Sequence, residues 1–299
     1  MIFPFVPPAT LLAGALLFDS LTTNHYEFGN GSVAVDDPMT FRESGITLVE
    51  PSFLGAGGGG SVWKMTVAGG GTSSSSDKNH GNNVVVKISW ARSTGSVRNE
   101  CEVLRVMEQK KVTGVERCLG SKEYAYDPKR IVIAMEPFAE DNNNKSQTGD
   151  DDGSGDLTSR LDDLSPKMAR KSAIQLSRTM AQMLAARVVT TDIQPLISKS
   201  KGDVLLIDMT EAKVLETVPL PAQGVKATSS SGLSDLDRAL VNAFCTEILG
   251  LIPDELLDEA SKSFWEEVRR IEAETPAGLD GDFKEILRDL PLAGAETFS

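Results

Sequence analysis

The chain has 299 residues and a formal net charge of −13 at pH 7, with 40% hydrophobic and 24% charged residues. This balance fits one large globular domain or two smaller ones with a sizeable core. The acidic charge argues against general nucleic-acid binding, which requires a basic surface to displace counterions from phosphates.

The cysteine and histidine content excludes several classes of site. With three cysteines, an odd and sparse set, we expect no disulfide framework and an intracellular, reducing compartment. With two histidines, His25 and His80, a histidine-based catalytic triad or a histidine zinc site is not expected.

The chain begins with an apolar segment. Residues 2–18 carry no charge, and prolines interrupt their first half. The uninterrupted part is about half the roughly 20 residues that a spanning helix needs. No Lys or Arg precedes Arg42, so a basic secretory or transit signal is not evident. We interpret residues 1–45 as an N-terminal extension. Packing on the domain, a membrane tether, an organelle-targeting remnant and disorder stay open as alternatives.

Period-two alternation predicts four strands in residues 46–139, and apolar spacing at i, i+4 and i+7 predicts one helix. The expected strands cover Ile46–Phe53, Ser61–Val67, Val84–Trp90 and Arg130–Met135. The expected helix covers Val97–Gln109. A Gly/Ser/Asn-rich stretch, Ala68–Asn83, predicts a flexible loop between two of these strands.

The second half is helical by the same criteria. Residues 140–157 are rich in Asn, Asp, Gly and Ser and read as an acidic linker. Beyond them, residues 158–299 are expected to contain helices over Pro166–Ala186, Leu236–Leu249 (ended by Gly250), Pro253–Glu272 and Asp282–Leu287. Two short strands, Leu196–Ile197 and Val204–Ile207, flank a turn at residues 201–203. Strands first and helices after indicate an α+β fold with two lobes.

The residues from Leu54 to Val62 satisfy a Gly-x-Gly-x-x-Gly-x-Val pattern at Gly55, Gly57, Gly60 and Val62. Glycine lets a backbone approach a phosphate closely, and backbone N–H groups bind its oxygens. A dinucleotide-binding loop would open a helix, whereas here a strand follows. We therefore predict a hairpin lid over phosphates, with a dinucleotide site and a plain glycine-rich linker as the alternatives.

Lys87 lies at the centre of an apolar strand, where an ammonium is costly unless it meets anions. Alternation places Val85 on the same face, where it can cover a purine. Glu100 lies on the next helix and is the expected partner of Lys87, with Glu102 as a neighbouring competitor. Lys87 on a solvent-facing edge strand and Glu100 as a surface residue are the plainer alternatives.

Two aspartates complete the candidate set. Asp192 follows the long helix on a loop, where a carboxylate can accept a proton from an acceptor hydroxyl. Asp208 ends the strand over residues 204–207, and Mg²⁺ prefers such oxygen ligands together with substrate phosphates. A turn or cap role is the alternative for both residues.

Over about residues 46–250 these segments resemble the protein kinase superfamily. The glycine pattern matches the family's glycine-rich loop, and Lys87 with Glu100 matches its lysine–glutamate pair. Asp192 matches the catalytic-loop aspartate, and Asp208 matches the metal-binding aspartate. Residues 135–138 resemble the hinge, which implies that Met135 is the gatekeeper and that backbone groups of Glu136 and Phe138 meet adenine.

The chain also departs from the family pattern. Thr190 and Thr191 replace His-Arg, Gln194 replaces a lysine, and Ile197 stands at the place of the second metal-binding asparagine. The resemblance implies a divergent ATP- and Mg²⁺-dependent protein kinase acting on Ser or Thr of a protein substrate. An ATP-binding pseudokinase or scaffold with a protein partner is the first alternative, and a small-molecule phosphotransferase is the second. No nucleic-acid partner is expected, and membrane contact is expected only through residues 2–18.

Overall fold

The computed structural model describes residues 39–41, 46–67, 83–124, 127–138, 156–215 and 234–274, together with Leu287. The apolar segment 2–18, residues 68–82 of the glycine/serine stretch and residues 140–155 of the expected linker lie outside the described residues, as does all of the helix expected over Asp282–Leu287 except Leu287.

The described chain is a mixed α/β structure whose main element is a six-stranded antiparallel sheet in the order β1-β2-β3-β4-β6-β5. Its strands are β1 (Met39–Phe41), β2 (Ile46–Ala56), β3 (Gly60–Val67), β4 (Asn83–Ser89), β5 (Cys118–Tyr124) and β6 (Asp127–Met135). All four expected strands are confirmed within a few residues at their ends.

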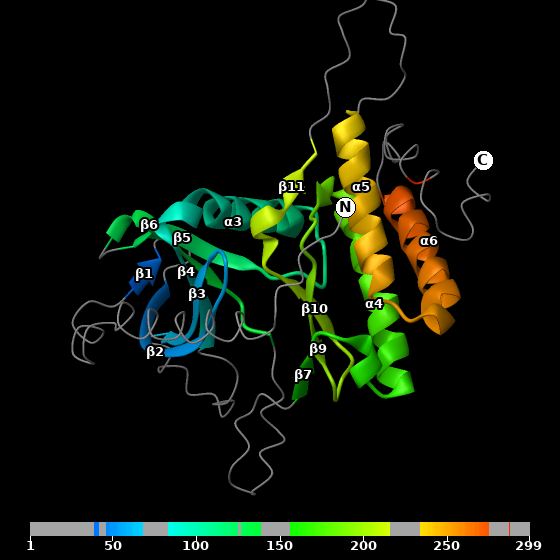
Figure 1. Cartoon of the computed structure of the whole chain (residues 1–299), viewed down its shortest axis with the longest axis horizontal. Coiled ribbons are helices and arrows are strands. Elements are labelled where there is room, and N and C mark those ends of the chain that lie inside the picture. The colour runs from blue at the N-terminus through cyan, green and yellow to red at the C-terminus, as the bar shows by residue number, and fades with distance from the viewer. Residues whose placement is uncertain are drawn as a thin grey trace, which may run out of the picture.

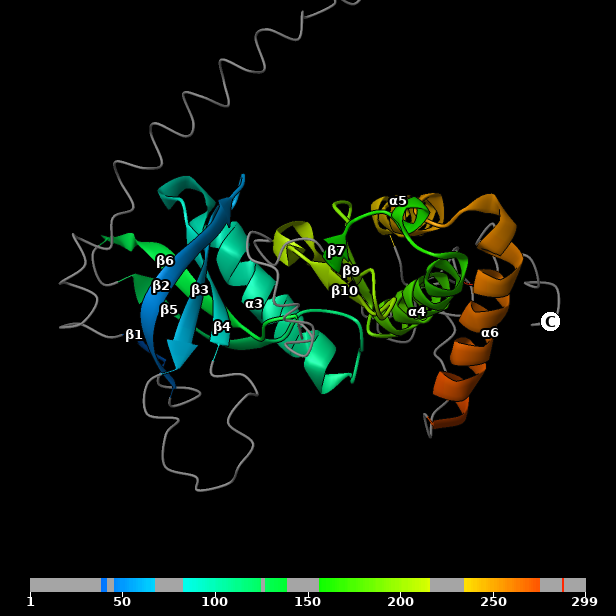
Figure 2. The same ribbon diagram turned by 90° about the horizontal axis from the view of Figure 1, so that it is seen from below.

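Helix α3 (Thr94–Gln109), which follows the 3-10 turn η1 (Ala91–Ser93), lies against one face of this sheet (Figures 1 and 2). It buries the face that carries Val97, Cys101, Leu104 and Met107, at the spacing that places residues on one side of a helix. The other sheet face buries a smaller cluster that includes Val86 and Ile88 of β4. Both faces of β4 are therefore covered, which explains its almost continuous apolar sequence.

The helical part gathers on the far side of α3 from the sheet (Figure 1). Its helices are α4 (Pro166–Ala185), α5 (Asp235–Gly250) and α6 (Leu257–Glu274), and α6 is preceded by the 3-10 turn η6 (Asp254–Leu256). Pro166 starts α4, where its missing N–H costs nothing. The Ser234 side chain caps α5 by accepting from the Asp237 amide. The helices predicted over Pro166–Ala186, Leu236–Leu249 and Pro253–Glu272 are confirmed, although Gly250 is the last residue of α5 rather than the residue after it.

A small antiparallel hairpin joins the two parts. It consists of β9 (Gln194–Ser198) and β10 (Val204–Ile207), with β7 (Leu157–Thr158) alongside β9. The expected turn before β10 is confirmed. Gly202 has φ of +67° there, and a Cβ at this position would lie 3.0 Å from the Met168 carbonyl oxygen. After β10 come the 3-10 turn η5 (Met209–Glu211) and β11 (Lys213–Val214), which pairs with β8 (Val188–Val189). The remaining 3-10 turn is η4 (Leu161–Asp163).

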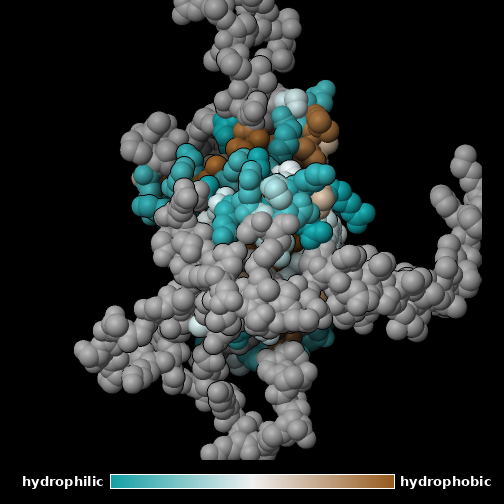
Figure 3. Space-filling view, turned by 90° about the vertical axis from the view of Figure 1, so that its left-hand side faces the viewer, coloured by the Kyte–Doolittle hydropathy of each residue, from teal (hydrophilic) through white to brown (hydrophobic). Residues whose placement is uncertain are grey.

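Polar residues dominate the described surface at the sheet end of the molecule, with small hydrophobic areas between them (Figure 3). This distribution is usual for the outside of a packed core. Among the helices of the described residues, none combines the length and the apolar character needed to cross a membrane.

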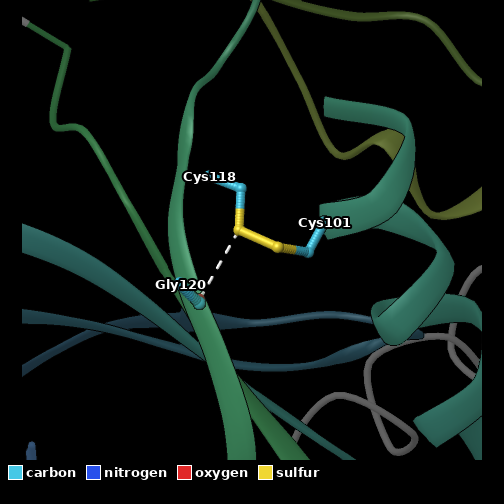
Figure 4. The surroundings of a disulfide bond; sticks show 3 residues. All are labelled: Cys101, Cys118 and Gly120. Atoms are coloured by element: carbon cyan, nitrogen blue, oxygen red, sulfur yellow. Dashed lines mark hydrogen bonds between the residues drawn. A yellow bond between two sulfur atoms is a disulfide. The ribbon is translucent and has the colours of Figure 1, made fainter. Parts of the chain in front are cut away.

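Cys101 of α3 and Cys118 of β5 form a disulfide, with their Cα atoms 5.4 Å apart (Figure 4). We expected no disulfide framework from three cysteines, and the sequence did not indicate this single bond. The pairing depends on the reversal of the chain after α3, which places the start of β5 beside the helix and is not visible in cysteine spacing. The reducing compartment stays a prediction.

Thiol counting tests this bond. In denaturant, we expect alkylation of one thiol, the buried Cys245, before treatment with a dithiol reductant, and of three thiols after it. Reduction should lower the free energy of unfolding by about 3 kcal/mol, because the bond closes a loop of 17 residues in the unfolded chain.

The variant Cys245→Ala is the matched control, with no reactive thiol before reduction and two after it. Alkylation of all three thiols in the unreduced protein would show that the disulfide is absent.

Candidate functional site

Three charged side chains from separate segments meet between the sheet, α3 and the β9–β10 hairpin. The Lys87 Nζ lies 3.0 Å from Glu100 Oε2 and 2.6 Å from Asp208 Oδ1. We call these three residues the ion cluster. Lys87 comes from β4, Glu100 from α3, and Asp208 from the residue that follows β10. The predicted partnership of Lys87 with Glu100 is present, while the competitor Glu102 is exposed.

The ion cluster is largely shielded from water. The side chains of Lys87 and Glu100 are 5% and 0% exposed, and that of Asp208 is 28% exposed. Burial alone would lower the pKa of Lys87, but the carboxylates of Glu100 and Asp208 outweigh it and raise this pKa. Burial likewise opposes ionisation of Asp208, yet Lys87 and Thr210 lower its pKa below the ordinary value. The Lys87–Asp208 pair is therefore ionised at neutral pH.

Glu100 has a second role besides pairing with Lys87. Its Oε1 accepts a hydrogen bond from the Met209 amide at 3.0 Å, at the start of η5. Burial raises the pKa of Glu100, while Lys87 and the Met209 amide oppose that shift. Because an ammonium and an amide both donate to it, we assign Glu100 as a carboxylate. Glu100 therefore ties α3 to both β4 and η5.

A fourth ionisable group lies behind Asp208 and was not indicated by the sequence. Glu116, from the segment between α3 and β5, is 9% exposed, and its Oε2 accepts from the Asp208 amide at 3.3 Å. Burial, followed by the charge of Glu100, raises the pKa of Glu116 to about 8. Glu116 is therefore mostly protonated at neutral pH, and the ion cluster then carries one positive and two negative charges.

The glycine-rich turn between β2 and β3 lies above the ion cluster. A Cβ on Gly59 would approach Lys87 Cε at 3.3 Å and Thr210 Cγ2 at 3.4 Å. A Cβ on Gly60 would lie 2.2 Å from the Ile88 carbonyl oxygen, which no side chain tolerates. Around Gly55 and Gly57, in contrast, nothing lies within 4 Å of such an atom. The predicted hairpin is confirmed. The glycines that lie against neighbouring atoms are Gly60, which belongs to the pattern, and Gly59, which does not.

Hydrogen bonds orient the peptide groups of this turn. The carbonyl oxygen of Gly57 accepts from Trp90 Nε1, and that of Gly58 accepts from Ser93 Oγ. In a trans peptide the N–H of the next residue points the opposite way from the carbonyl. The amides of Gly58 and Gly59 therefore point away from Trp90 and Ser93.

The apolar candidates share a face with Lys87. Val62 of β3 is the cross-strand partner of Lys87, and Val85 of β4 is the partner of Met135. Directly paired residues, and residues two apart on one strand, lie on the same side of a sheet. The Glu136 amide donates to the Arg117 carbonyl at 3.0 Å, so this amide is already used within the protein. Phe138 is partly buried.

Asp192 is not part of the ion cluster. It is exposed, and its Oδ2 accepts from Gln194 Nε2 at 3.1 Å. Its backbone is held by Thr190, whose Oγ1 accepts from the Asp192 amide at 3.3 Å. The register pairs Gln194 with Ile207, so Asp192 and Asp208 flank the same end of the β9–β10 hairpin.

With this geometry established, comparison of the sequence with models of known protein families and with curated proteins finds no match.

Two glycine substitutions test the turn. Gly60→Ala should lower the free energy of unfolding by about 1–3 kcal/mol, the usual cost of forcing atoms into a filled space. Gly57→Ala is the matched control and should change it by less than about 0.5 kcal/mol, because the space around it is open. Equal effects in urea unfolding would contradict the close approach at Gly60.

The raised pKa of Glu116 predicts a pH dependence of stability. Its value rises from 4.5 in the unfolded chain to about 8 in the native protein. The native state therefore holds a proton that the unfolded state releases within this window, and stability falls as pH rises from about 5 to 8.

Glu116→Gln removes this titration and keeps an acceptor oxygen. Relative to this variant, the wild-type protein should lose up to a few kcal/mol of stability across the window, as measured by urea unfolding at several pH values. Parallel pH curves for the two proteins would contradict a raised pKa.

Proposed function

We propose that this protein is a divergent protein-kinase-like phosphotransferase that moves the γ-phosphate of ATP to a Ser or Thr hydroxyl of a protein. In this proposal the sheet with α3 forms a small lobe and the helices after residue 157 form a large one. The observation that carries the proposal is the ion cluster, in which Lys87, Glu100 and Asp208 meet although Asp208 is 121 residues from Lys87.

The ion cluster supports triphosphate binding because it combines a fixed ammonium with an accessible carboxylate. Glu100 holds Lys87 from the buried side. Asp208, the most exposed of the three, is the member that can exchange its contact with Lys87 for a metal ion. Lys87 would then bind phosphate oxygens, and these would replace the Asp208 carboxylate as its second anionic partner.

Mg²⁺ fits this arrangement as an ion carried in by the nucleotide. Among the described residues, no three His, Cys, Asp or Glu side chains group closely enough to hold a metal by themselves. Mg²⁺ does not require such a group, because it commonly binds one or two carboxylates together with substrate phosphates and water. Asp208 would provide the carboxylate, and the metal would neutralise charge on the phosphates.

The glycine turn supports a phosphate lid. Gly59 packs on Lys87 and Thr210, and the amides of Gly58 and Gly59 point away from the groups that anchor the turn. Amides in such a turn are ready donors to anionic oxygens. Val62, Val85 and Met135, which share a face with Lys87, would cover the purine. The Glu136 carbonyl and the Phe138 backbone would meet its edge.

Asp192 would receive the proton of the acceptor hydroxyl. Its position at the same end of the hairpin as Asp208 supports this role, since the acceptor must approach the terminal phosphate. Gln194, bound to the Asp192 carboxylate, would orient it but brings no charge to the transferred phosphoryl group.

The contact between Gln194 and Asp192 favours a second candidate function, nucleotide binding without efficient phosphate transfer. A neutral amide occupies the place of a lysine and binds the carboxylate that would serve as base. The loss of one charge-stabilising group commonly costs about 10²–10³ in rate. A pseudokinase with a protein partner is therefore the alternative.

Phosphate transfer from labelled ATP with Mg²⁺ to dephosphorylated casein tests the proposal. We expect measurable incorporation by the wild-type protein and a decrease of about 10²-fold or more for Asp208→Asn, because this variant loses the metal-binding charge. Asp203→Asn is the matched control and should retain the rate, because Asp203 is a half-exposed residue of the hairpin turn that pairs with Lys171.

Incorporation that is unchanged in Asp208→Asn would contradict the proposal. Binding of ATP with Mg²⁺ but no incorporation by the wild-type protein would support the pseudokinase instead.

A further inference from the structure

We propose that Glu116 is a positioning residue that holds Asp208 in the conformation needed to bind a nucleotide-borne Mg²⁺. This inference rests on the proposed function and extends it to a residue outside the ion cluster.

Glu116 is fixed against the hairpin by backbone pairing. Val115 forms a parallel bridge with Leu206 of β10. On either side of it, the Leu206 amide donates to the Gly114 carbonyl at 2.8 Å, and the Glu116 amide donates to the Leu206 carbonyl at 3.2 Å. The segment from Gly114 to Glu116 thus lies along β10 as an added strand-like neighbour. This pairing places the Glu116 side chain beside Asp208, the residue that follows β10.

The Glu116 carboxyl holds the backbone of Asp208 in a conformation that the chain does not favour by itself. Asp208 has φ of 60° and ψ of 64°, the left-handed region that costs free energy for a residue other than glycine. Its amide donates to Glu116 Oε2 at 3.3 Å, and the next amide, that of Met209, donates to Glu100 Oε1. Two buried carboxyl groups from different segments therefore hold consecutive amides of this turn.

The consequence is a defined direction for the Asp208 side chain. Glu116 holds the Asp208 backbone, and the Asp208 carboxylate points toward Lys87 and Thr210. Its Oδ1 accepts from Lys87 at 2.6 Å and from Thr210 at 2.7 Å. Without the Glu116 contact, Asp208 can leave the left-handed region and its carboxylate loses this direction. Glu116 acts through Asp208 and does not itself reach the phosphates or the metal.

Calorimetric titration with ATP, with and without Mg²⁺, separates positioning from a purely structural role. In Glu116→Leu, which removes the acceptor, we expect the gain in ATP affinity produced by Mg²⁺ to fall about tenfold, the usual effect of losing one buried hydrogen bond. The affinity for ATP without Mg²⁺ should be unchanged. Glu116→Gln keeps an acceptor oxygen and should keep the Mg²⁺ gain.

A purely structural role would lower both affinities together, in proportion to the folded fraction measured by circular dichroism. That result, or a Mg²⁺ gain in Glu116→Leu equal to that of the wild-type protein, would overturn the inference. Should Glu116→Leu fail to fold, Glu116→Asp takes its place. It keeps the carboxylate but withdraws it by one methylene from the Asp208 amide, so it too should lose the Mg²⁺ gain.

Asp208→Asn distinguishes failure of the proposed function from failure of the proposed role of Glu116. If the wild-type protein itself shows no Mg²⁺ gain, or shows one that survives Asp208→Asn, the proposed function fails and the inference with it. If Asp208→Asn abolishes the gain while Glu116→Leu retains it, only the role of Glu116 is wrong.

Discussion

Lys87 must keep a positive charge at the centre of a buried strand, and the surrounding structure is organised around this requirement. An unpaired ammonium in such a place would cost several kcal/mol, so carboxylates must come to it from elsewhere in the chain. Glu100 arrives on α3 and Asp208 at the end of β10. The ion cluster therefore links the sheet, the helix that covers it and the hairpin that leads to the helical part.

This link has an electrostatic consequence. Two carboxylates share one ammonium, and a third carboxyl, Glu116, lies behind them with its pKa raised to about 8. Adding one more negative charge to this buried group is unfavourable, whereas adding a cation on the open side of Asp208 is favourable. In the proposed site, a metal ion at Asp208 would offset part of the negative charge that the phosphates bring.

The parts of this account that could be predicted from sequence are those with a local signal. In β4, a lysine within a run of valines indicated a buried charge. In α3, the apolar spacing placed Glu100 on the helix face that packs against the sheet. β9 and β10 were indicated by apolar runs around a glycine turn. In contrast, β5 alternates weakly and contains Gly120, and β1 has only three residues, so neither carried a readable pattern.

The missed site residues depend on tertiary contacts. Glu116 is a charged residue next to Arg117, and such a pair of charged residues is typical of an exposed segment. Its burial results from the bridge between Val115 and Leu206, two residues far apart in the chain. The Cys101–Cys118 disulfide likewise depends on tertiary structure, because it forms only when the chain reverses after α3. Gly59 is one of four consecutive glycines, and only the position of Lys87 in the structure shows that this glycine lies next to the ion cluster.

A crystal structure with a non-hydrolysable ATP analogue and Mg²⁺ tests the central claim most directly. We expect the phosphates within ion-pair distance of Lys87 Nζ, beneath the glycine turn, with one metal ion on Asp208 and the Lys87–Glu100 pair intact. An analogue bound away from Lys87, or a Lys87–Asp208 contact that persists at saturating analogue, would contradict the account.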